Sequence, residues 1–206
     1  MPSPSPKAAR THKPPEQRRQ EILDAAMLVF AECGYRCADV DRIAEKAGVG
    51  KGTVYRIFFN KEAVFLASVE QAIEGLRSYV LAGIESLEDP REVIRRIVHC
   101  YFEYFDHNPT VVELFVQERA EFRNQSKPLY FVYQETEREK WLAFYQQLQA
   151  SGLMRDVDPA VVMDLVGNLL LGTVFSQRLA GDRQPLVEQV DGVVDLLFHG
   201  FIKPTQ

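Results

Sequence analysis

Residues 39–62 read DVDRIAEKAGVGKGTVYRIFFNKE, and this stretch constrains the fold more than any other part of the chain. Two short helical patterns flank a corner at Gly48, where glycine permits a positive φ. Asp39 is placed to cap the first helix. In the second helix Val54 and Phe58 recur four residues apart and point inward, which leaves a basic and aromatic outer face. This pattern is typical of the helix-turn-helix of DNA-binding proteins.

Two other interpretations apply to the same residues. Many helical proteins contain two short helices joined by a glycine turn without binding DNA. Residues 48–53, GVGKGT, also faintly resemble a phosphate-binding loop. Such a loop needs G-x-x-x-x-G-K-[ST] after a buried strand. Here Lys51 is followed by Gly52 and the preceding residues are helical, so we favour the helix-turn-helix.

The residues around the motif strengthen this interpretation, because residues 16–65 resemble the N-terminal domain of the TetR (tetracycline-repressor-like) family of bacterial transcriptional regulators. The resemblance rests on RRQEILDAA at 18–26, FAECGY at 30–35, IAEKAGV at 43–49 and KGTVYR at 51–56, followed by Phe58, Asn60, Lys61 and Glu62. It implies an all-α protein of about nine helices. An N-terminal helix-turn-helix domain would precede a larger helical domain for effector binding and dimerisation.

The chain departs from the family pattern at two positions. Gly50 stands where a small hydroxyl residue usually precedes the recognition helix, and Ala38 replaces a hydroxyl residue ahead of the first motif helix. Each change removes a potential helix cap or phosphate contact.

Composition and charge further restrict the classes of protein to which this chain can belong. The 206 residues are 46% hydrophobic, enough for a packed core, and no run of about twenty apolar residues predicts a membrane span. Residues 1–61 carry 11 basic and 7 acidic side chains, whereas the rest carry 13 and 22. A basic head on an acidic body suits a protein that presents one end to a polyanion. Residues 1–14, rich in proline, serine and basic residues, are expected to form a disordered arm rather than a secretory signal.

Three cysteines suggest a reducing, cytoplasmic location. Cys33 and Cys37 lie four residues apart, but the second half of a zinc site is missing. We therefore expect no metal and no cofactor.

Helix signals divide the chain into nine segments. The first is expected over residues 15–33 and ends at Gly34, and the two motif helices follow. The later helices are expected to begin after Asn60, at Asp89-Pro90, Thr110, Ser126-Lys127-Pro128, Asp158-Pro159 and Gln184-Pro185. The first domain is then 15–62 and the second 63–206.

The last two helices have an unusual pattern, because residues 161–175 are apolar nearly all round. Such a helix is buried on both faces. In the TetR family this pair forms a four-helix bundle with its copy, although a buried internal hairpin would show the same pattern. The expected interface residues are Val161, Leu165, Leu169, Gly172, Ser176, Leu186, Val190, Val193 and Leu197.

Aromatic residues concentrate between positions 101 and 175. They exceed what a simple helical layer needs, and an apolar chamber with a few polar groups is typical of a small-molecule site. We expect a cavity for a mostly apolar effector. Its candidate residues are His99, Tyr101, Glu103, Phe105, Arg119, Phe122, Tyr133, Trp141 and Phe175.

These observations predict a ligand-responsive repressor that binds double-stranded DNA, at a palindromic operator, as a homodimer. The DNA-binding residues would be Arg42, Lys51, Gly52, Thr53, Tyr55, Arg56 and Lys61. A helix-turn-helix factor without an effector, with an architectural or cell-division role, is the alternative. An enzyme is disfavoured, because no G-x-S-x-G or H-E-x-x-H motif is present.

Overall fold

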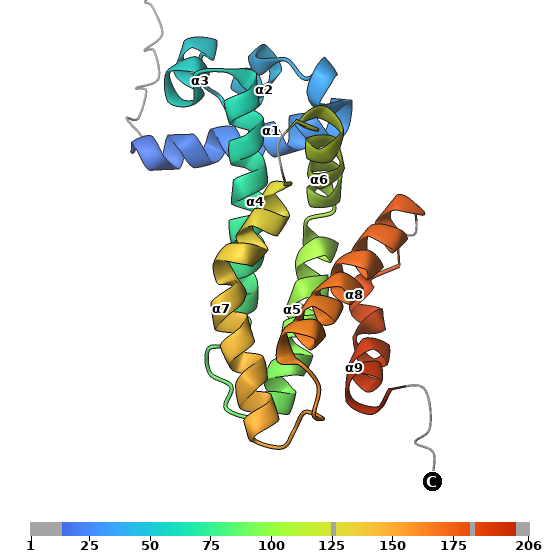
Figure 1. Cartoon of the computed structure of the whole chain (residues 1–206). Coiled ribbons are helices and arrows are strands. Elements are labelled where there is room, and N and C mark those ends of the chain that lie inside the picture. Colours follow the sequence, from blue (N-terminus) through green and yellow to red (C-terminus); the bar gives the residue numbers. More distant parts are fainter. Residues whose placement is uncertain (1–13, 125–126, 182–183, 201–206) are drawn as a thin grey trace, which may run out of the picture.

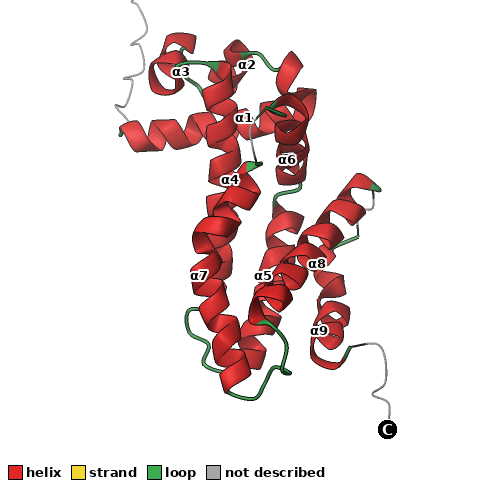
Figure 2. Cartoon of the chain, in the orientation of Figure 1, coloured by secondary structure: helices red, strands yellow, loops and turns green. Residues whose placement is uncertain are grey.

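The computed structural model describes residues 14–124, 127–181 and 184–200. The expected arm at residues 1–14 therefore lies outside the described residues except for its last position. Across the described ranges the chain forms helices joined by short loops, with no strand (Figures 1 and 2). The predicted all-α class is confirmed.

Three helices form a head at one end of the molecule (Figure 1). They are α1 (Pro15–Cys37), α2 (Val40–Lys46) and α3 (Lys51–Phe58). Gly34 interrupts α1 with a φ of 78°, so the expected helix end is present there, and one further helical turn follows the kink. The buried face of α1 packs the head with Ile22, Ala26 and Phe30.

Six further helices form the body. They are α4 (Lys61–Ile84), α5 (Pro90–His107), α6 (Thr110–Glu121), α7 (Leu129–Ala150), α8 (Pro159–Leu179) and α9 (Val190–His199), with a short 3₁₀ helix, η1 (Leu186–Gln189), before the last. The caps read from the sequence are in place. The side chains of Asn60, Asp89 and Asp158 each accept a backbone N–H from the first turn of the following helix.

The last helix begins later than expected, because its first turn is the 3₁₀ helix η1. Asp106 of α5 explains this difference. Its carboxylate accepts the backbone N–H groups of Leu186 and Val187 at 2.9 and 3.1 Å, and it also pairs with Arg178 of α8. One partly buried carboxylate therefore holds α5, α8 and the start of the last helical segment together.

The long helix α4 connects head and body (Figure 1). Phe65 and Val69, in its first half, are fully buried. Further along, Ala72 accepts a 2.7 Å hydrogen bond from the hydroxyl of Tyr104 on α5. A single helix is thus part of the hydrophobic core at both ends of the molecule.

The turn between α3 and α4 is strained. Phe59 has a φ of 68° and a ψ of −48°, and the N–H of Asn60 donates to the carbonyl of Phe58 at 2.7 Å. This is a γ-turn with a positive φ, a conformation that is rare for a residue with a Cβ atom. The Phe59 side chain is 85% exposed, so packing does not compensate for the strain.

Replacing Phe59 with glycine is expected to raise the free energy of unfolding by about 1 kcal/mol, because glycine adopts a positive φ without strain. Phe59→Ala is the matched control, since it removes the ring and retains the Cβ atom. Chemical denaturation of the three proteins measures the difference. Equal stability of the glycine and alanine variants would contradict the assignment of strain to this turn.

Candidate nucleic-acid interface

Helix α3, the expected recognition helix, is held by its inner face and presents its outer face to solvent. Val54 and Phe58 are buried, as the sequence predicts. Gly48 adopts a φ of 66° at the corner, and Asp39 caps α2 by accepting the N–H of Asp41 at 2.9 Å. The local sequence therefore produces a short helix packed across another one with its polar side outward.

The outer face of α3 carries Lys51, Gly52, Tyr55 and Arg56. Lys51, Gly52 and Arg56 are exposed, and Tyr55 is 41% exposed. The departure at Gly50 has the expected consequence, because α3 has no side-chain cap at its N-terminus. A methyl group at Gly50 or Gly52 would meet no other atom within 4 Å, so another molecule can approach the backbone closely at both positions.

Basic residues of the head are paired with nearby carboxylates. Lys51 donates to Asp41 at 2.7 Å, and the pKa of Lys51 is raised, chiefly by this hydrogen bond. Arg42 and Lys46 both contact Glu32, at 2.6 and 3.2 Å. Exposed pairs of this kind contribute at most about 1 kcal/mol, so a phosphate can replace the carboxylate at little cost.

Lys61 occupies a different position from the one expected for a phosphate contact. Its ammonium donates to the backbone carbonyls of Tyr35, Arg36 and Ala38 at 2.9–3.2 Å. It also lies 4.7 Å from the centre of the Tyr35 ring. These contacts stabilise the end of α1 after its kink, and the sequence pattern at Lys61 could not distinguish this role from phosphate binding.

Among the described residues, the predicted effector residues lie in several parts of the body. Tyr101 and Phe105 are buried and in mutual contact, with ring centres 5.2 Å apart. Phe115 packs between Phe105 and Phe175, with ring centres 6.4 and 6.5 Å away. The hydroxyls of Tyr101 and Tyr130 are 2.9 Å apart, which provides each with a buried partner. In this part of the body the aromatic side chains interdigitate.

Phe122 belongs to a second aromatic group, at the junction of head and body. Its ring lies 5.0 Å from Tyr35 of α1 and 5.4 Å from Phe65 of α4, and Phe65 in turn contacts Phe30 at 4.9 Å. Gln117, also on α6, donates to the carbonyl of Phe30 at 2.9 Å. Helix α6 is therefore tied directly to the head.

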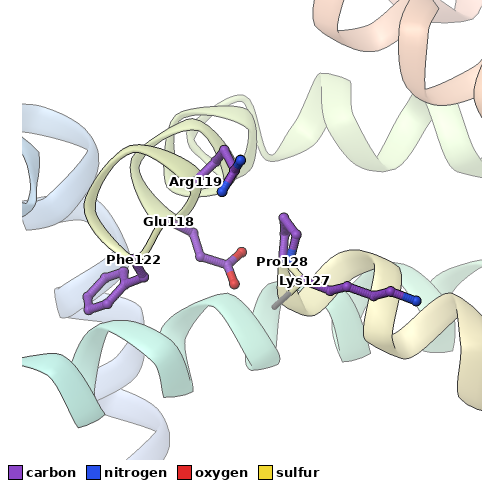
Figure 3. A pocket seen from close by; sticks show the side chains of 5 residues that line it. All are labelled: Glu118, Arg119, Phe122, Lys127 and Pro128. Carbon is purple, nitrogen blue, oxygen red and sulfur yellow. The ribbon is translucent and has the colours of Figure 1, made fainter. Parts of the chain in front are cut away.

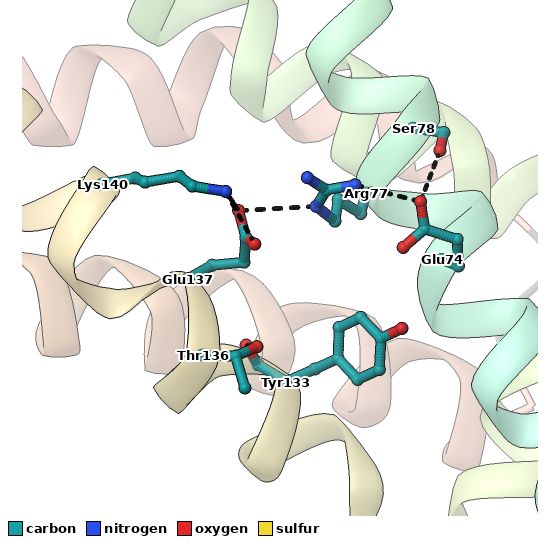
Figure 4. A network of polar contacts seen from close by, with 7 residues as sticks. All are labelled: Glu74, Arg77, Ser78, Tyr133, Thr136, Glu137 and Lys140. Carbon is teal, nitrogen blue, oxygen red and sulfur yellow. Dashed lines mark hydrogen bonds and ion pairs between the residues drawn. The ribbon is translucent and has the colours of Figure 1, made fainter.

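The remaining predicted effector residues make no ring contact with either aromatic group in the described part of the chain. His99 and Glu103 are half-buried on α5, and Arg119 is exposed on α6. Tyr133 and Trp141 are half-buried on α7. Figure 4 shows Tyr133 beside a polar network that joins α7 to α4, in which Arg77 contacts Glu137 at 3.4 Å.

Two hollows in the described part of the chain lie near predicted site residues. The first, shown in Figure 3, is a gap of about 170 Å³ of empty space beside Glu118, too narrow to admit a water molecule. The expected preformed effector cavity is thus not found there. The gap beside Glu118 is also lined by Arg119, Phe122, Lys127 and Pro128.

The second hollow is an open groove of about 620 Å³ along α8. It includes Leu169, Gly172 and Ser176, three of the expected interface residues. Val161 and Leu165 on the same helix are 52% and 63% exposed. These five residues therefore remain available for contact with another molecule.

Three expected interface residues are instead part of the internal core. Leu186, Val190 and Val193 are at most 8% exposed, in the segment that packs against α5. Leu197 is half-buried, and its neighbour Leu196 is 38% exposed. The apolar pattern of this segment is explained by packing within the chain.

Helix α8 is long and apolar enough to cross a membrane by length and composition, although the sequence pattern had predicted no span. Two ion pairs hold this helix to the body. Asp164 contacts Arg138 of α7 at 2.6 Å, and Arg178 contacts Asp106 of α5. Because core helices of soluble proteins pass the same test, composition by itself is weak evidence for a membrane span.

The chain is similar to known proteins both in the head and over most of its length. Residues 22–68 match the family model described as "Bacterial regulatory proteins, tetR family". The HTH-type transcriptional activator FasR of Mycolicibacterium smegmatis is 34% identical over 95 residues, which cover 46% of this chain and 43% of that protein. The chain thus aligns with less than half of FasR.

Two further proteins are similar over most of their length. The HTH-type transcriptional repressor KstR2 of Mycobacterium tuberculosis is 27% identical over 181 residues, or 85% of this chain and 87% of that protein. The structure of the regulator FadR from Bacillus subtilis in complex with stearoyl-CoA superposes with a TM-score of 0.72 at 21% identity. It covers 89% of this chain and 99% of that one, which shows a shared fold.

Glu118 is a buried carboxyl group whose ionisation affects the stability of the fold. It is 2% exposed, one carboxylate oxygen accepts the N–H of Leu129 at 2.8 Å, and the other is buried without a hydrogen-bond partner. Burial raises the pKa of this carboxyl group, against the lowering effect of the Leu129 hydrogen bond. In the unfolded chain this carboxyl group ionises at a lower pH, near its ordinary pKa of about 4.3. The free energy of unfolding is therefore expected to fall as the pH rises from that value through the folded pKa.

Glu118→Gln retains an acceptor for Leu129 and removes this titration. The wild-type protein is expected to lose stability relative to the variant as the pH rises from about 4. Urea denaturation at a series of pH values measures the difference. Parallel pH profiles for the two proteins would show that Glu118 has no raised pKa.

Proposed function

We propose that the chain, whose residues 22–68 match the family model of tetR-type bacterial regulatory proteins, is a ligand-responsive repressor that binds a palindromic operator as a homodimer in the bacterial cytoplasm. The observation that carries the proposal is the outer face of α3, where basic and aromatic side chains are exposed on a helix fixed by Val54 and Phe58. Residues 15–62 would form the DNA-binding domain, and residues 63–206 the domain for dimerisation and the effector.

DNA would meet the N-terminal end of α3 first. Lys51 and Thr53 are placed to reach base edges in the major groove, and Gly52 allows close approach of the backbone. Tyr55, Arg56 and Arg42 would contact phosphates, which position the protein without reading sequence. Lys61 is left out of this set, because its ammonium already contacts three carbonyls.

A second copy of the chain is the proposed partner for the α8 face. The groove at Leu169, Gly172 and Ser176 continues the exposed positions Val161 and Leu165 along one side of the helix. A contiguous apolar face of this kind typically marks a protein interface. Two heads are also required to occupy the two half-sites of a palindrome.

The effector is proposed to have a large apolar part, and the acyl chain of a long-chain acyl-CoA is one example. FadR of Bacillus subtilis was solved with stearoyl-CoA, and its fold matches this chain. Because the aromatic residues of the body are packed together, ligand entry would require helices to separate. Helix α7 is suited to this movement, since only Tyr130 and Leu148 of its 22 residues are buried.

Movement of α6 would also change the position of the head. Phe122 and Gln117 on α6 contact the head residues Tyr35 and Phe30. A ligand that binds better to the displaced arrangement would favour dimers whose heads no longer match the operator spacing.

The effector-free alternative keeps the same DNA-binding head. The observation that favours it is the interdigitated aromatic core, in which Tyr101, Phe105, Phe115 and Phe175 make mutual ring contacts. The effect of stearoyl-CoA on stability and on DNA binding distinguishes the two functions.

The first prediction concerns DNA binding, measured by fluorescence anisotropy on duplexes selected from a random pool. Lys51→Ala is expected to weaken binding to the preferred sequence by about 1–3 kcal/mol and to relax the base preference. Tyr55→Ala is expected to weaken binding to all sequences alike. Arg56→Ala should also reduce the slope of log affinity against log salt by about 0.9, the contribution of one phosphate contact.

Arg155→Ala, which removes an exposed basic side chain in the loop between α7 and α8, is the matched control and should leave binding unchanged. Full binding by the combined Lys51→Ala, Tyr55→Ala and Arg56→Ala variant would show that the assigned face is wrong.

The second prediction concerns assembly. Leu165→Glu places a charge on a side chain that is 63% exposed in the single chain, so the monomer should fold normally. It is expected to convert the dimer to a monomer in analytical ultracentrifugation, because a buried unpaired carboxylate at the interface is costly. Leu153→Glu, at a residue that is 43% exposed outside α8, should remain dimeric. A monomeric wild-type protein at micromolar concentration would contradict the proposal.

The third prediction concerns the effector. Stearoyl-CoA is expected to raise the free energy of unfolding by about 2.7 kcal/mol at a hundredfold excess over its dissociation constant, and to reduce operator binding. Free coenzyme A is the control for the acyl chain. If neither stearoyl-CoA nor a panel of apolar aromatic compounds changes stability or DNA binding, the effector-free function is favoured.

A further inference from the structure

Three side chains of types that commonly bind metals lie together on α5, at its contact with α4. They are His99, Cys100 and Glu103, and their potential ligand atoms all lie within 4.8 Å of one another. The spacing explains the cluster. Residues three and four positions apart share one face of a helix, so Glu103 faces both His99 and Cys100.

The imidazole is oriented for coordination. The Nδ1 atom of His99 is buried, has no hydrogen-bond partner in the described structure, and lies 3.6 Å from Oε2 of Glu103. A buried ring nitrogen without a partner is uncommon, because buried polar atoms are nearly always hydrogen-bonded. An ion between the imidazole and the carboxylate would satisfy this atom.

Helix α4 provides the surroundings that such an ion needs. The hydroxyl of Tyr79 donates to Oε2 of Glu103 at 2.7 Å, which fixes the carboxylate as metal-binding carboxylates are usually fixed. The sulfur of Cys100 lies against Gly83, where an added Cβ atom would come within 2.4 Å of it. Glycine at this position therefore makes room for the thiol.

We propose that His99, Cys100 and Glu103 bind one divalent transition-metal ion of the zinc class through Nδ1, Sγ and a carboxylate oxygen. Nitrogen, sulfur and oxygen donors suit Zn²⁺, which takes four ligands, so a fourth position is left for water. Binding releases the thiol proton to solvent. The thiolate and carboxylate then balance the charge of the ion, next to the guanidinium-bearing Arg96, whose side chain lies near Gly83.

This site uses no residue of the head or of the α8 face, and ion binding is measured without DNA or effector. His99 and Glu103 are also among the candidate effector residues. The sequence contains no paired ligand motifs of the kind that predict a zinc site. A cluster on one helix, supported by Tyr79 and Gly83 of another, has no such linear pattern.

Cobalt(II) is a suitable probe, because a thiolate ligand gives it a charge-transfer absorption band. Titration of the full-length, reduced protein is expected to give this band at one ion per chain, with Zn²⁺ displacing the cobalt. Cys100→Ser should abolish the band, and His99→Gln should weaken Co²⁺ binding by more than about 100-fold. Tyr79→Phe removes only the hydrogen bond to Glu103, so a loss of about 10-fold to 100-fold is expected.

Two controls separate this site from surface binding. Cys37→Ser removes an exposed thiol, and His199→Gln removes an exposed histidine that contacts Asp195 at 2.9 Å. Both variants should bind Co²⁺ like the wild type. The proposal is overturned if no thiolate band forms, if the band persists in Cys100→Ser, or if His99→Gln binds Co²⁺ as tightly as the wild type.

Discussion

The aromatic contact between α1, α4 and α6 determines how the two parts of this molecule relate. Phe65 of α4 packs against Phe30 of α1 and Phe122 of α6, with ring centres 4.9 and 5.4 Å apart. Aromatic pairs at these distances add about 0.5–1.5 kcal/mol each beyond their burial. Since α4 continues into the body, the head cannot turn independently of it. The position of the proposed DNA-binding surface is therefore coupled to the packing of the body.

The charges of the head suit a surface that binds and releases a polyanion. The basic side chains of Arg42, Lys51 and Arg56 are exposed. Lys51 and Arg42 already have carboxylate partners in Asp41 and Glu32. Replacing a weak carboxylate partner with a phosphate costs little free energy. The net free energy of binding then depends on the counterions that the polyanion releases. Binding on this surface is accordingly expected to be sensitive to salt, and shape and base contacts at the end of α3 would supply the specificity.

Residue type and spacing predicted where helices begin but gave less information on what faces each helix. The caps at Asn60, Asp89 and Asp158 depend on contacts within a few residues, and the structure contains them. Lys61 has a long side chain that reaches carbonyls more than twenty residues away, so its position in a family motif did not reveal its partners. The aromatic residues of the body are similarly ambiguous, because a packed core and an open cavity require the same side chains.

By itself the sequence determined the helical class, the helix-turn-helix corner at Gly48 and the inward face of α3 at Val54 and Phe58, because these follow from local spacing and backbone preference. Tertiary structure decided which apolar faces remain uncovered. Val190 and Val193 pack inside against α5, whereas Leu165 on the neighbouring helix stays exposed. It also brought Tyr79 and Gly83 to the His99, Cys100 and Glu103 cluster. The physical reason is that burial and ligand geometry depend on which helices meet, and periodicity within one helix does not specify its neighbours.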